Sequence, residues 1–242
     1  MEVIKSVNNP TIKDLVKLKQ KKVRDEKRLF LAEGEHLVEE AKDAGILQKL
    51  IVREEAKEKY SGENVLYVSD EVMKKLSETV SLLDVIGVCS YMEERPYQSA
   101  KILILDGVQD PGNVGTLIRT ALSFGFNDII CSNDSVDIYN EKVLRSTQGA
   151  VFKVNYHRGN LLPIIHDLKA LGYTVYGTSL MNGKPLTTFE KVDKLAIVLG
   201  NEGAGVRTSV FMECDKNIYI EMEAFESLNV AVAGGIILYH FK

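Results

Sequence analysis

The chain has 242 residues, enough for one large domain or two smaller ones, and its 45% hydrophobic and 26% charged content is typical of globular proteins. Its three cysteines, Cys89, Cys131 and Cys214, lack paired spacing, which argues against a disulfide framework or a zinc site. The net charge of -4 hides an asymmetry, because residues 1–30 carry nine Lys and Arg against four Asp and Glu, a local +5, and the remainder carries -9.

The termini predict no membrane segment. The basic N-terminus lacks the apolar core of a signal peptide, and the longest apolar run, residues 230–239, is too short to span a bilayer. The histidines show no ligand spacing either, so we expect no metal site. Scattered cysteines fit a reducing compartment, and we expect a cytoplasmic protein.

The basic N-terminal segment predicts a helix that starts at Asn9-Pro10, with Asn as the cap and Pro at the first helical position. Lysines cover most of this helix. They favour either an ordinary solvated face or an arm that contacts nucleic-acid phosphates by releasing counterions. Both interpretations stay open from the sequence.

Residues 29–92 alternate between short apolar runs and helical stretches, which predicts a small α/β domain. The expected strands are 29–32, 50–52, 65–68 and 85–91, and the expected helices are 35–44, 54–60 and 70–77. Residues 93–99 are polar and contain Pro96, so a linker is expected there. We therefore expect an N-terminal domain over 1–95 and a C-terminal domain over 96–242.

The C-terminal part repeats the α/β alternation. The expected strands are 102–105, 128–131, 151–155, 174–176, 195–199 and 218–222, and the expected helices are 113–123, 141–148, 161–171, 207–214 and one opening at 227–229. Strands that alternate with helices in this way predict a parallel sheet.

Two polar loops follow buried strands near the C-terminus. The run 195–199 breaks on Gly200-Asn201-Glu202-Gly203, and the strand at 218–222 is followed by Ser227-Leu228-Asn229. Ligands of open α/β sheets bind at the carboxyl ends of strands, so the two loops predict one site. A phosphate cradle is the competing interpretation, but the loop lacks a Walker lysine and dinucleotide spacing, and Glu202 suits a cation better.

These two segments and a third one carry a family resemblance. The third segment is Asp110-Pro111-Gly112-Asn113-Val114-Gly115, followed by Arg119. In this order the three segments resemble the motifs of the SpoU/TrmH family of RNA 2'-O-ribose methyltransferases, in the SPOUT superfamily. Three ordered motifs over about 130 residues are far more specific than a lone glycine pattern.

The resemblance implies the fold and the cofactor. It implies a C-terminal parallel-sheet domain with a deep trefoil knot, preceded by a small α/β domain of the ribosomal-protein (L30e-like) type that binds the RNA substrate. It also implies S-adenosylmethionine as the cofactor. The residues implied to bind it are Thr178, Leu199, Gly200, Asn201, Gly203, Ile220, Met222 and Leu228.

The resemblance further implies methyl transfer from S-adenosylmethionine to a ribose 2'-hydroxyl, with ribosomal RNA favoured over transfer RNA. It places Arg119 at the catalytic step, and because a guanidinium is not deprotonated in proteins, we expect Arg119 to grip an RNA phosphate. Asn113, Glu202, Ser227 and Asn229 are then expected to orient Arg119, the nucleotide and the cofactor. Family members are typically homodimers, so Arg119 acting from a neighbouring subunit is part of this expectation.

The segment at 218–229 departs from the family pattern. Glu221 and Ala224 stand near positions where Pro and Gly are common, and the segment is one residue short. This departure motivates one alternative, a non-catalytic RNA-binding or ribosome-assembly factor with the same fold. A second alternative is methylation of a base in place of a ribose. Residues 145–150 are similar to a further family segment near the active site, or are simply the end of an amphipathic helix.

Overall fold

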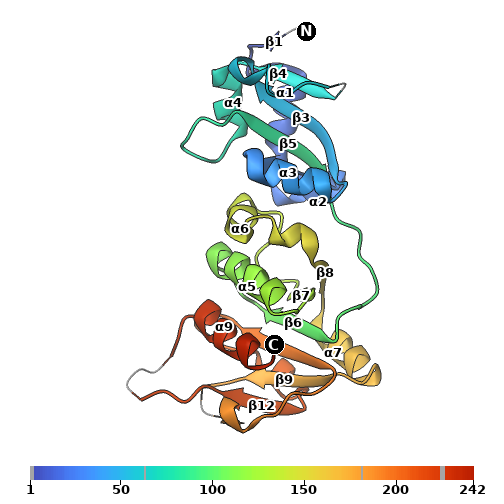
Figure 1. The fold of residues 1–242 in the computed structure, drawn as a ribbon, viewed down its shortest axis with the longest axis vertical. Helices are drawn as coiled ribbons and strands as arrows, with labels where there is room; N and C mark the ends of the chain where they lie inside the picture. Colours follow the sequence, from blue (N-terminus) through green and yellow to red (C-terminus); the bar gives the residue numbers. More distant parts are fainter. Residues whose placement is uncertain (1–2, 63, 181, 224–226) are drawn as a thin grey trace. The chain divides into compact units, whose positions relative to one another are not determined.

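The computed structural model describes residues 3–62, 64–180, 182–223 and 227–242. The chain divides into two units (Figure 1). Unit 1 comprises Met1–Glu93 and Tyr139–Phe152, and unit 2 comprises Glu94–Ile138 and Lys153–Lys242. The segment Tyr139–Phe152, which the sequence assigned to the C-terminal domain, thus belongs to unit 1. Among the helices of the described ranges, none is long and apolar enough to cross a membrane.

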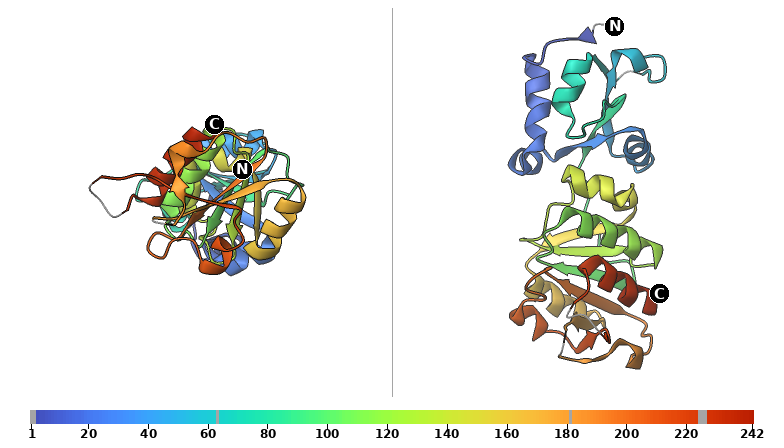
Figure 2. Two further views of the ribbon diagram at one scale, coloured as in Figure 1. Left: turned by 90° about the horizontal axis from the view of Figure 1, so that it is seen from below. Right: turned by 90° about the vertical axis from the view of Figure 1, so that its left-hand side faces the viewer.

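Unit 1 is a mixed five-stranded sheet covered by helices on both faces (Figure 2). Its strand order is β1-β4-β3-β5-β2, with β5 antiparallel to β2 and β3. The elements are β1 Val3–Ile4, α1 Pro10–Val16, η1 Lys17–Lys19, α2 Lys21–Lys27, β2 Leu29–Glu33, α3 Glu35–Asp43, β3 Leu47–Arg53, η2 Glu54–Ala56, β4 Val65–Val68, α4 Asp70–Leu76, β5 Val85–Ser90, α6 Glu141–Thr147 and η3 Ala150–Lys153.

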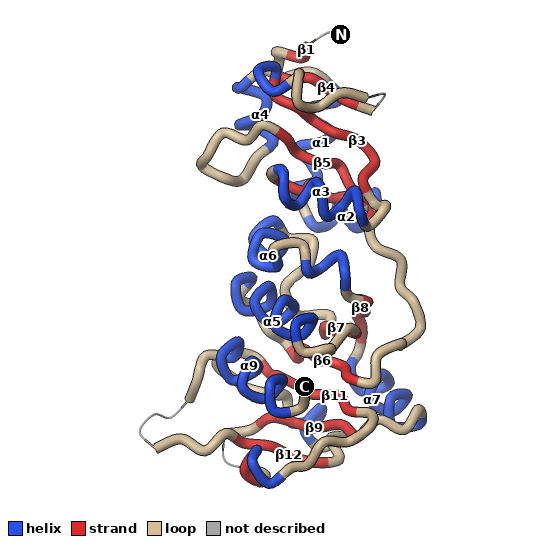
Figure 3. The backbone as a smooth tube through the Cα atoms, viewed as in Figure 1, coloured by secondary structure: helices blue, strands red, loops and turns tan. Residues whose placement is uncertain are grey.

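Unit 2 is built on a seven-stranded sheet in which every pairing is parallel. The strand order is β10-β12-β9-β11-β6-β7-β8, and β6, β11, β9 and β12 follow one another in Figure 3. The elements are β6 Lys101–Asp106, α5 Pro111–Ser123, β7 Asp128–Ser132, β8 Asn155–Gly159, α7 Leu161–Ala170, β9 Thr174–Thr178, β10 Lys184–Pro185, η4 Leu186–Thr188, β11 Leu195–Gly200, α8 Thr208–Phe211, β12 Lys216–Tyr219 and α9 Val230–His240. The predicted α/β fold with a parallel sheet is confirmed.

The two central strands of unit 2 bring the predicted motifs together. β11 pairs with β6 in register from Leu195 opposite Lys101 to Gly200 opposite Asp106. Both strands therefore end at the same edge, and the loops that follow them are neighbours. Against this pair packs α9, where a Cβ on Gly234 would overlap Leu117 of α5. The absence of a side chain at Gly234 thus lets α9 approach α5 and β11 closely.

Several expected elements are wrong in the structure. Residues 151–155 form no strand, because Val151 and Phe152 lie in the 3-10 turn η3 and the strand begins at Asn155. The apolar run misled the prediction, since Phe152 packs its ring against Phe30 of β2 and Val151 is buried. The expected helices over 54–60 and 207–214 shrink to η2 and α8, and the strand at 218–222 is displaced to Lys216–Tyr219.

Candidate active site

Glu202 joins the loop after β11 to the loop after β6. Its carboxylate accepts hydrogen bonds from the backbone N–H groups of Gln109 (3.2 Å) and Asp110 (3.0 Å) and from Asn113 Nδ2 (3.0 Å). Burial alone would raise the pKa of Glu202, but the hydrogen bonds from Asn113 and the backbone outweigh it, so the pKa lies below its ordinary value. Glu202 is therefore an anion at neutral pH, suited to accepting hydrogen bonds.

Asn113 connects this carboxylate to the start of α9. Its Oδ1 accepts a hydrogen bond from Asn229 Nδ2 (3.0 Å), while its backbone N–H donates to the Asp110 side chain (2.8 Å), the N-cap of α5. Asn229 in turn caps α9 by accepting from the backbone N–H of Ala231 (2.8 Å). Three of the expected site residues, Asn113, Glu202 and Asn229, therefore form one hydrogen-bonded chain across two helix N-termini.

Asn201 shapes the glycine loop. Its Nδ2 donates to the carbonyl of Gly107 (2.8 Å), and its Oδ1 accepts from the backbone N–H groups of Gly203 (3.0 Å) and Ala204 (3.0 Å). The loop closes where Asn201 and Gly205 exchange backbone hydrogen bonds, with Gly205 at a φ of +71°. A positive φ at this point favours glycine, which explains its place in the motif.

A buried ion pair latches the same loop to the end of β6. The fully buried Asp106 carboxylate accepts hydrogen bonds from the backbone N–H (2.8 Å) and Nε (2.7 Å) of Arg207. Arg207 Nη1 also lies 3.6 Å from Asp134 Oδ2. At Gly200 a side chain would overlap the backbone of Gly205, so the loop can fold back over the strand end only with glycine at position 200.

A second layer supports the loop after β6. The backbone N–H of Gly107 donates to Ser132 Oγ (2.8 Å) and Ser135 Oγ (3.1 Å), both in or after β7. Arg158 of β8 donates to three carbonyls of that β7 loop, those of Asn133 (2.7 Å), Val136 (3.3 Å) and Ser135. Its guanidinium thus holds the loop on which the Gly107 turn rests.

A pocket opens beside this network, at the carboxyl ends of β9, β11 and β12. Its wall is largely apolar, with Ile218, Val230 and Ile237 among the lining residues. The polar side chains in the lining include Thr178, whose Oγ1 donates to the carbonyl of Val198 (2.8 Å). An apolar wall with a few polar groups at the rim suits a nucleoside that carries a charged tail.

The residues expected to bind a cofactor all line this pocket. They come from the end of β9, the end of β11 with the glycine loop, and the segment after β12: Thr178, Leu199, Gly200, Asn201, Gly203, Ile220, Met222 and Leu228. Glu202 and Ser227 line it as well. Their expected roles toward a ligand stay predictions, but the structure brings the residues together.

Other lining residues were missed from the sequence: Ser179, Leu180, Gly205, Ile218, Tyr219, Val230, Ala233 and Ile237. Three of these, Val230, Ala233 and Ile237, follow one another at helical spacing along α9. In the sequence this spacing does not stand out, because α9 is apolar on all sides. Leu180 follows a predicted strand that carried no ligand-binding motif.

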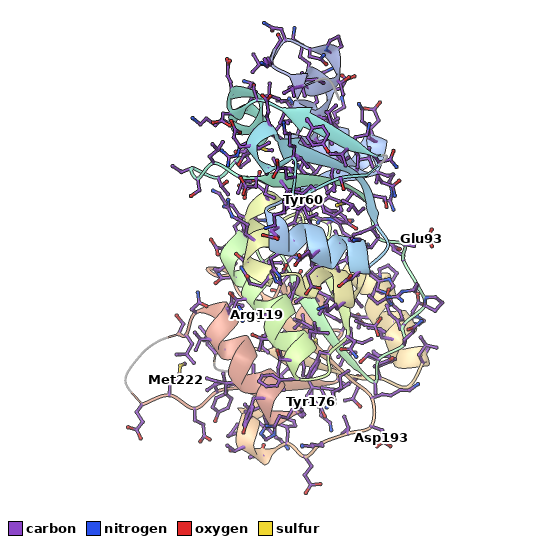
Figure 4. The ribbon with its side chains drawn as sticks, turned by 45° about the horizontal axis from the view of Figure 1, so that its top comes forward. Tyr60, Glu93, Arg119, Tyr176, Asp193 and Met222 are labelled. Carbon is purple, nitrogen blue, oxygen red and sulfur yellow. The ribbon has the colours of Figure 1, made fainter. Side chains whose placement is uncertain are left out.

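Arg119 lies apart from the hydrogen-bonded network. It is exposed on α5, and α9 passes close to this part of α5, since a Cβ on Gly235 would stand 3.9 Å from Thr120 Cγ2 (Figure 4). Among the residues that the structure describes, none forms a hydrogen bond or ion pair with its guanidinium. Arg119 also does not line the pocket, and neither do Asn113 and Asn229.

The fold and site define a class of protein: an α/β domain that holds a ligand pocket at the carboxyl edge of an open parallel sheet, with a carboxylate-centred network at the rim. A model of the SpoU rRNA Methylase family matches residues 100–239, and a model of the MRM3-like substrate binding domain matches residues 9–86. The chain belongs to the SpoU rRNA Methylase family.

Two relatives and one solved structure illustrate the similarity. The chain is 39% identical over 247 residues to the 23S rRNA (guanosine(2553)-2'-O)-methyltransferase RlmP of Bacillus subtilis, covering 100% of both chains. It is 34% identical to the 23S rRNA (guanosine-2'-O-)-methyltransferase RlmB of Coxiella burnetii, covering 94% of this chain and 87% of that one. The AdoMet-bound rRNA methyltransferase from Sinorhizobium meliloti superposes with a TM-score of 0.89 at 31% identity, covering 99% of this chain and 96% of the other.

Proposed function

We propose that this protein transfers a methyl group from S-adenosylmethionine to a ribose 2'-hydroxyl of RNA, with ribosomal RNA as the substrate class. The observation that carries the proposal is the meeting of three strand-end loops. The network of Glu202, Asn113 and Asn229 borders a pocket lined by every residue expected to hold the cofactor. Family membership and relatives named as rRNA 2'-O-methyltransferases support it.

The pocket fits the cofactor in its chemistry. When bound, S-adenosylmethionine supplies a methyl group on a positively charged sulfonium. The apolar side chains of Ile220, Leu228 and Leu199 would hold the adenosine, while the backbone of the glycine loop would bind the polar groups. Glu202 adds a carboxylate at the rim, which favours a cationic ligand over a phosphate.

Glu202 acts as a positioning residue in this proposal. Because its pKa is lowered, it is a weak base, and its oxygens are already engaged by Asn113 and two backbone N–H groups. We assign it the task of fixing the loop after β6 against the glycine loop. Asn113 and Asn229 extend this rigid frame to α9, and Ser227, exposed at the rim, is placed to orient the nucleotide.

Arg119 is assigned to the RNA. Its exposed guanidinium has no partner among the described side chains and backbone groups, and five N–H donors suit bidentate contact with a phosphate. A guanidinium does not accept the proton of the 2'-hydroxyl, so that proton passes to the phosphate or to water. Arg119→Ala should lose most of the turnover, Arg119→Lys should retain part of it, and cofactor affinity should not change. Full activity in both variants would remove Arg119 from the mechanism.

We further propose a homodimer in which Arg119 serves the pocket of the partner subunit. The outer face of α9 exposes Val232, Ile236 and Tyr239, at 52%, 40% and 57% of their surfaces. These positions form one stripe at helical spacing, and a second copy of the chain would remove it from water. Because α9 lies against α5, a copy seated on this stripe would also approach Arg119.

Mixing inactive subunits tests the shared site. Arg119→Ala subunits keep the pocket, while Gly200→Val subunits keep Arg119 but clash with the glycine loop. If the sites are shared, mixed dimers should regain activity that neither parent shows. Activity that stays absent after verified subunit exchange would place Arg119 and its pocket in the same chain.

The methyl transfer itself is tested with ribosomal RNA from cells that lack this protein. Labelled S-adenosylmethionine, enzyme and RNA are incubated, and the RNA is digested to nucleosides. A 2'-O-methylated nucleoside supports the proposal, and a methylated base supports the alternative activity. Absence of both product and cofactor binding by calorimetry, with RNA present, would instead favour a non-catalytic RNA-binding factor. The trefoil knot, the ribosomal-protein type of unit 1 and the cytoplasmic location stay predictions.

A further inference from the structure

The sheet of unit 1 has two faces that are covered by different helices. Leu31, Ile51 and Ile86 pack on one face with residues of α1, η1, α2 and α4. Val52 and Val85, their neighbours in sequence, pack on the other face with residues of α3 and η2. Successive residues of a strand point to opposite faces, so the two groups of helices lie on opposite sides of the sheet (Figure 2).

α6 belongs to the α3 side. Phe30, which alternates with Leu31 on β2, packs its ring against Tyr139 at 4.8 Å and Phe152 at 6.0 Å between centroids. These two rings flank α6 in the chain. Next to them, the Gln148 carbonyl that ends α6 lies 3.2 Å from Nε2 of His36 in α3.

The two sides carry opposite charge. On the α1 side, residues 10–27 together with α4 contain nine Lys and Arg against five Asp and Glu, a net of +4. On the α3 side, the helices α3, η2 and α6 contain three Lys and Arg against seven Asp and Glu, a net of -4. The positive charge of the N-terminal segment therefore lies on one side of unit 1, and the opposite side is negative.

Part of the positive charge on the α1 side is paired with groups of the protein itself. Lys17 pairs with Asp14 at 2.8 Å, and Lys19 lies 3.0 Å from a Glu78 carboxylate oxygen. Arg24 is buried and donates to main-chain carbonyls, so its role is structural. Lys21 pairs with an aspartate one turn later. Within residues 10–27 and α4, the exposed lysines that pair with no described residue are Lys13, Lys22, Lys27, Lys74 and Lys75.

These lysines lie on helices that pack together. Ile12 of α1 and Val72 of α4 belong to the same core cluster, as does Val23 of α2 at its edge. The pKa of Asp14 on α1 is lowered by the hydrogen bond and charge of Lys17, and the charge of Lys27 on α2 contributes as well. The positive potential of α1 thus overlaps that of α2.

We propose that the α1 side of unit 1, through Lys13, Lys22, Lys27, Lys74 and Lys75, is where the RNA backbone docks, and that the α3 side faces away from RNA. The proposal rests on the proposed function and names the surface that carries its substrate contact. Clustered, unpaired lysines gain affinity for a polyanion by releasing its counterions. An acidic face repels the same polyanion, so the polarity also sets the orientation of unit 1 on the RNA.

An RNA suits this surface better than a membrane. A helix that lies on a membrane inserts large apolar side chains between lipids. Among the described residues of unit 1, the large apolar side chain that is strongly exposed is Val80, which lies in the loop between α4 and β5 and not on the lysine-bearing helices.

The test compares two double variants of the full-length protein. Lys74→Gln/Lys75→Gln removes two lysines from the α1 side, and Lys42→Gln/Lys57→Gln removes two exposed lysines on or next to α3 and η2, with the same change in net charge. Affinity for a mixed-sequence RNA hairpin is measured over a series of salt concentrations. The slope of log affinity against log salt concentration should become less steep by about 1.5 in the first variant, since each phosphate that is no longer neutralised removes about 0.7 to 0.9 from the slope. In the second variant the slope should stay unchanged.

Lys13→Gln/Lys22→Gln/Lys27→Gln should flatten the slope further, by about 2 to 3. Equal effects of the two double variants would overturn the proposal, because net charge and not the face would then set affinity. Tighter binding of all proteins to anionic phosphatidylserine vesicles than to the hairpin would overturn it as well. Cofactor affinity, measured by calorimetry, reports folding and should match the unsubstituted protein in every variant. Methylation is measured separately, so loss of the proposed activity and loss of the proposed surface are distinguished.

Discussion

The ion pair between Asp106 and Arg207 offers the sharpest test of how the glycine loop is held. Asp106 is fully buried at the end of β6, and its carboxylate accepts from the backbone N–H and the Nε of Arg207. Arg207→Gln removes the guanidinium and keeps the backbone N–H. The carboxylate then stays buried without its charged partner, and the loop loses its latch.

The cost follows from burial. Removing one partner of a buried ion pair costs about 3 to 5 kcal/mol. The Arg207 side chain is 48% exposed and one backbone hydrogen bond remains, so water can replace part of the loss. We expect a local destabilisation of about 2 kcal/mol, which corresponds to a roughly 30-fold larger open population of the loop.

Native-state hydrogen exchange measures this opening at the amides of Asn201 and Gly205, which are hydrogen-bonded to each other's carbonyls. The matched control is Arg53→Gln in unit 1. Arg53 also donates Nε to an aspartate (3.0 Å), but the side chain of that residue, Asp84, is 49% exposed. An exposed pair is worth less than about 1 kcal/mol, so the control should have a small effect. If the Arg207→Gln variant loses no more stability than the Arg53→Gln variant, the reasoning is refuted.

Three further predictions concern the same site. Glu202→Gln should lower the free energy of unfolding of unit 2 by about 1 kcal/mol, after discounting for exposure. Because the folded pKa of Glu202 is lowered, this stability difference should be fully present above the unfolded pKa of about 4.3. It should vanish as the pH falls through the folded pKa, which acid denaturation measures. Gly234→Ala should lower the free energy of unfolding by about 1 to 3 kcal/mol and weaken cofactor binding, because the new methyl overlaps Leu117. Gly235→Ala should be neutral or stabilising in thermal unfolding, since its methyl makes only a 3.9 Å contact. Arg158→Gln should reduce kcat about tenfold or more with unchanged cofactor affinity, because Arg158 holds the loop after β7, and that loop supports the loop after β6. Unchanged amide exchange in both loops would contradict this prediction.

The pocket could be predicted from the sequence because its residues sit where strands end. Gly200, Asn201 and Gly203 interrupt an apolar run, and such a break in a parallel sheet marks the carboxyl edge. The segment at 218–229 likewise follows the end of a strand, β12. What could not be predicted was the α9 wall, since a helix that is apolar all round gives no periodic signal for the face that lines a pocket.

The segment from Tyr139 to Phe152 shows a second limit. The helix predicted over 141–148 is confirmed as α6, but the apolar residues that follow it predicted a strand over 151–155. Tertiary packing decided otherwise, because the rings of Phe152 and Tyr139 pack around Phe30 of a distant strand. Burial is visible in composition, while the partner that provides it is not. The Asp106–Arg207 ion pair could not be predicted for the same reason, since 101 residues separate its partners.

Glu221 lies in the segment that departs from the pattern implied by the family resemblance. The resemblance implied a proline near this position, which raised the expectation of an altered cofactor loop. Ala224, the other position that departs, lies outside the described residues. Ile220 and Met222 line the pocket, and Glu221 between them does not. Its carboxylate instead accepts a hydrogen bond from Thr187 Oγ1 (3.3 Å).

This alternation is that of an extended segment, whose successive side chains point to opposite sides. The substitution therefore falls on the side that faces away from the pocket, and Glu221→Pro should leave cofactor affinity by calorimetry within about twofold, less than about 0.4 kcal/mol. Thr187→Ala is the matched control for the missing hydrogen bond. An affinity change of tenfold or more in Glu221→Pro alone would show that the backbone of this segment, and not only its side chains, is set by residue 221.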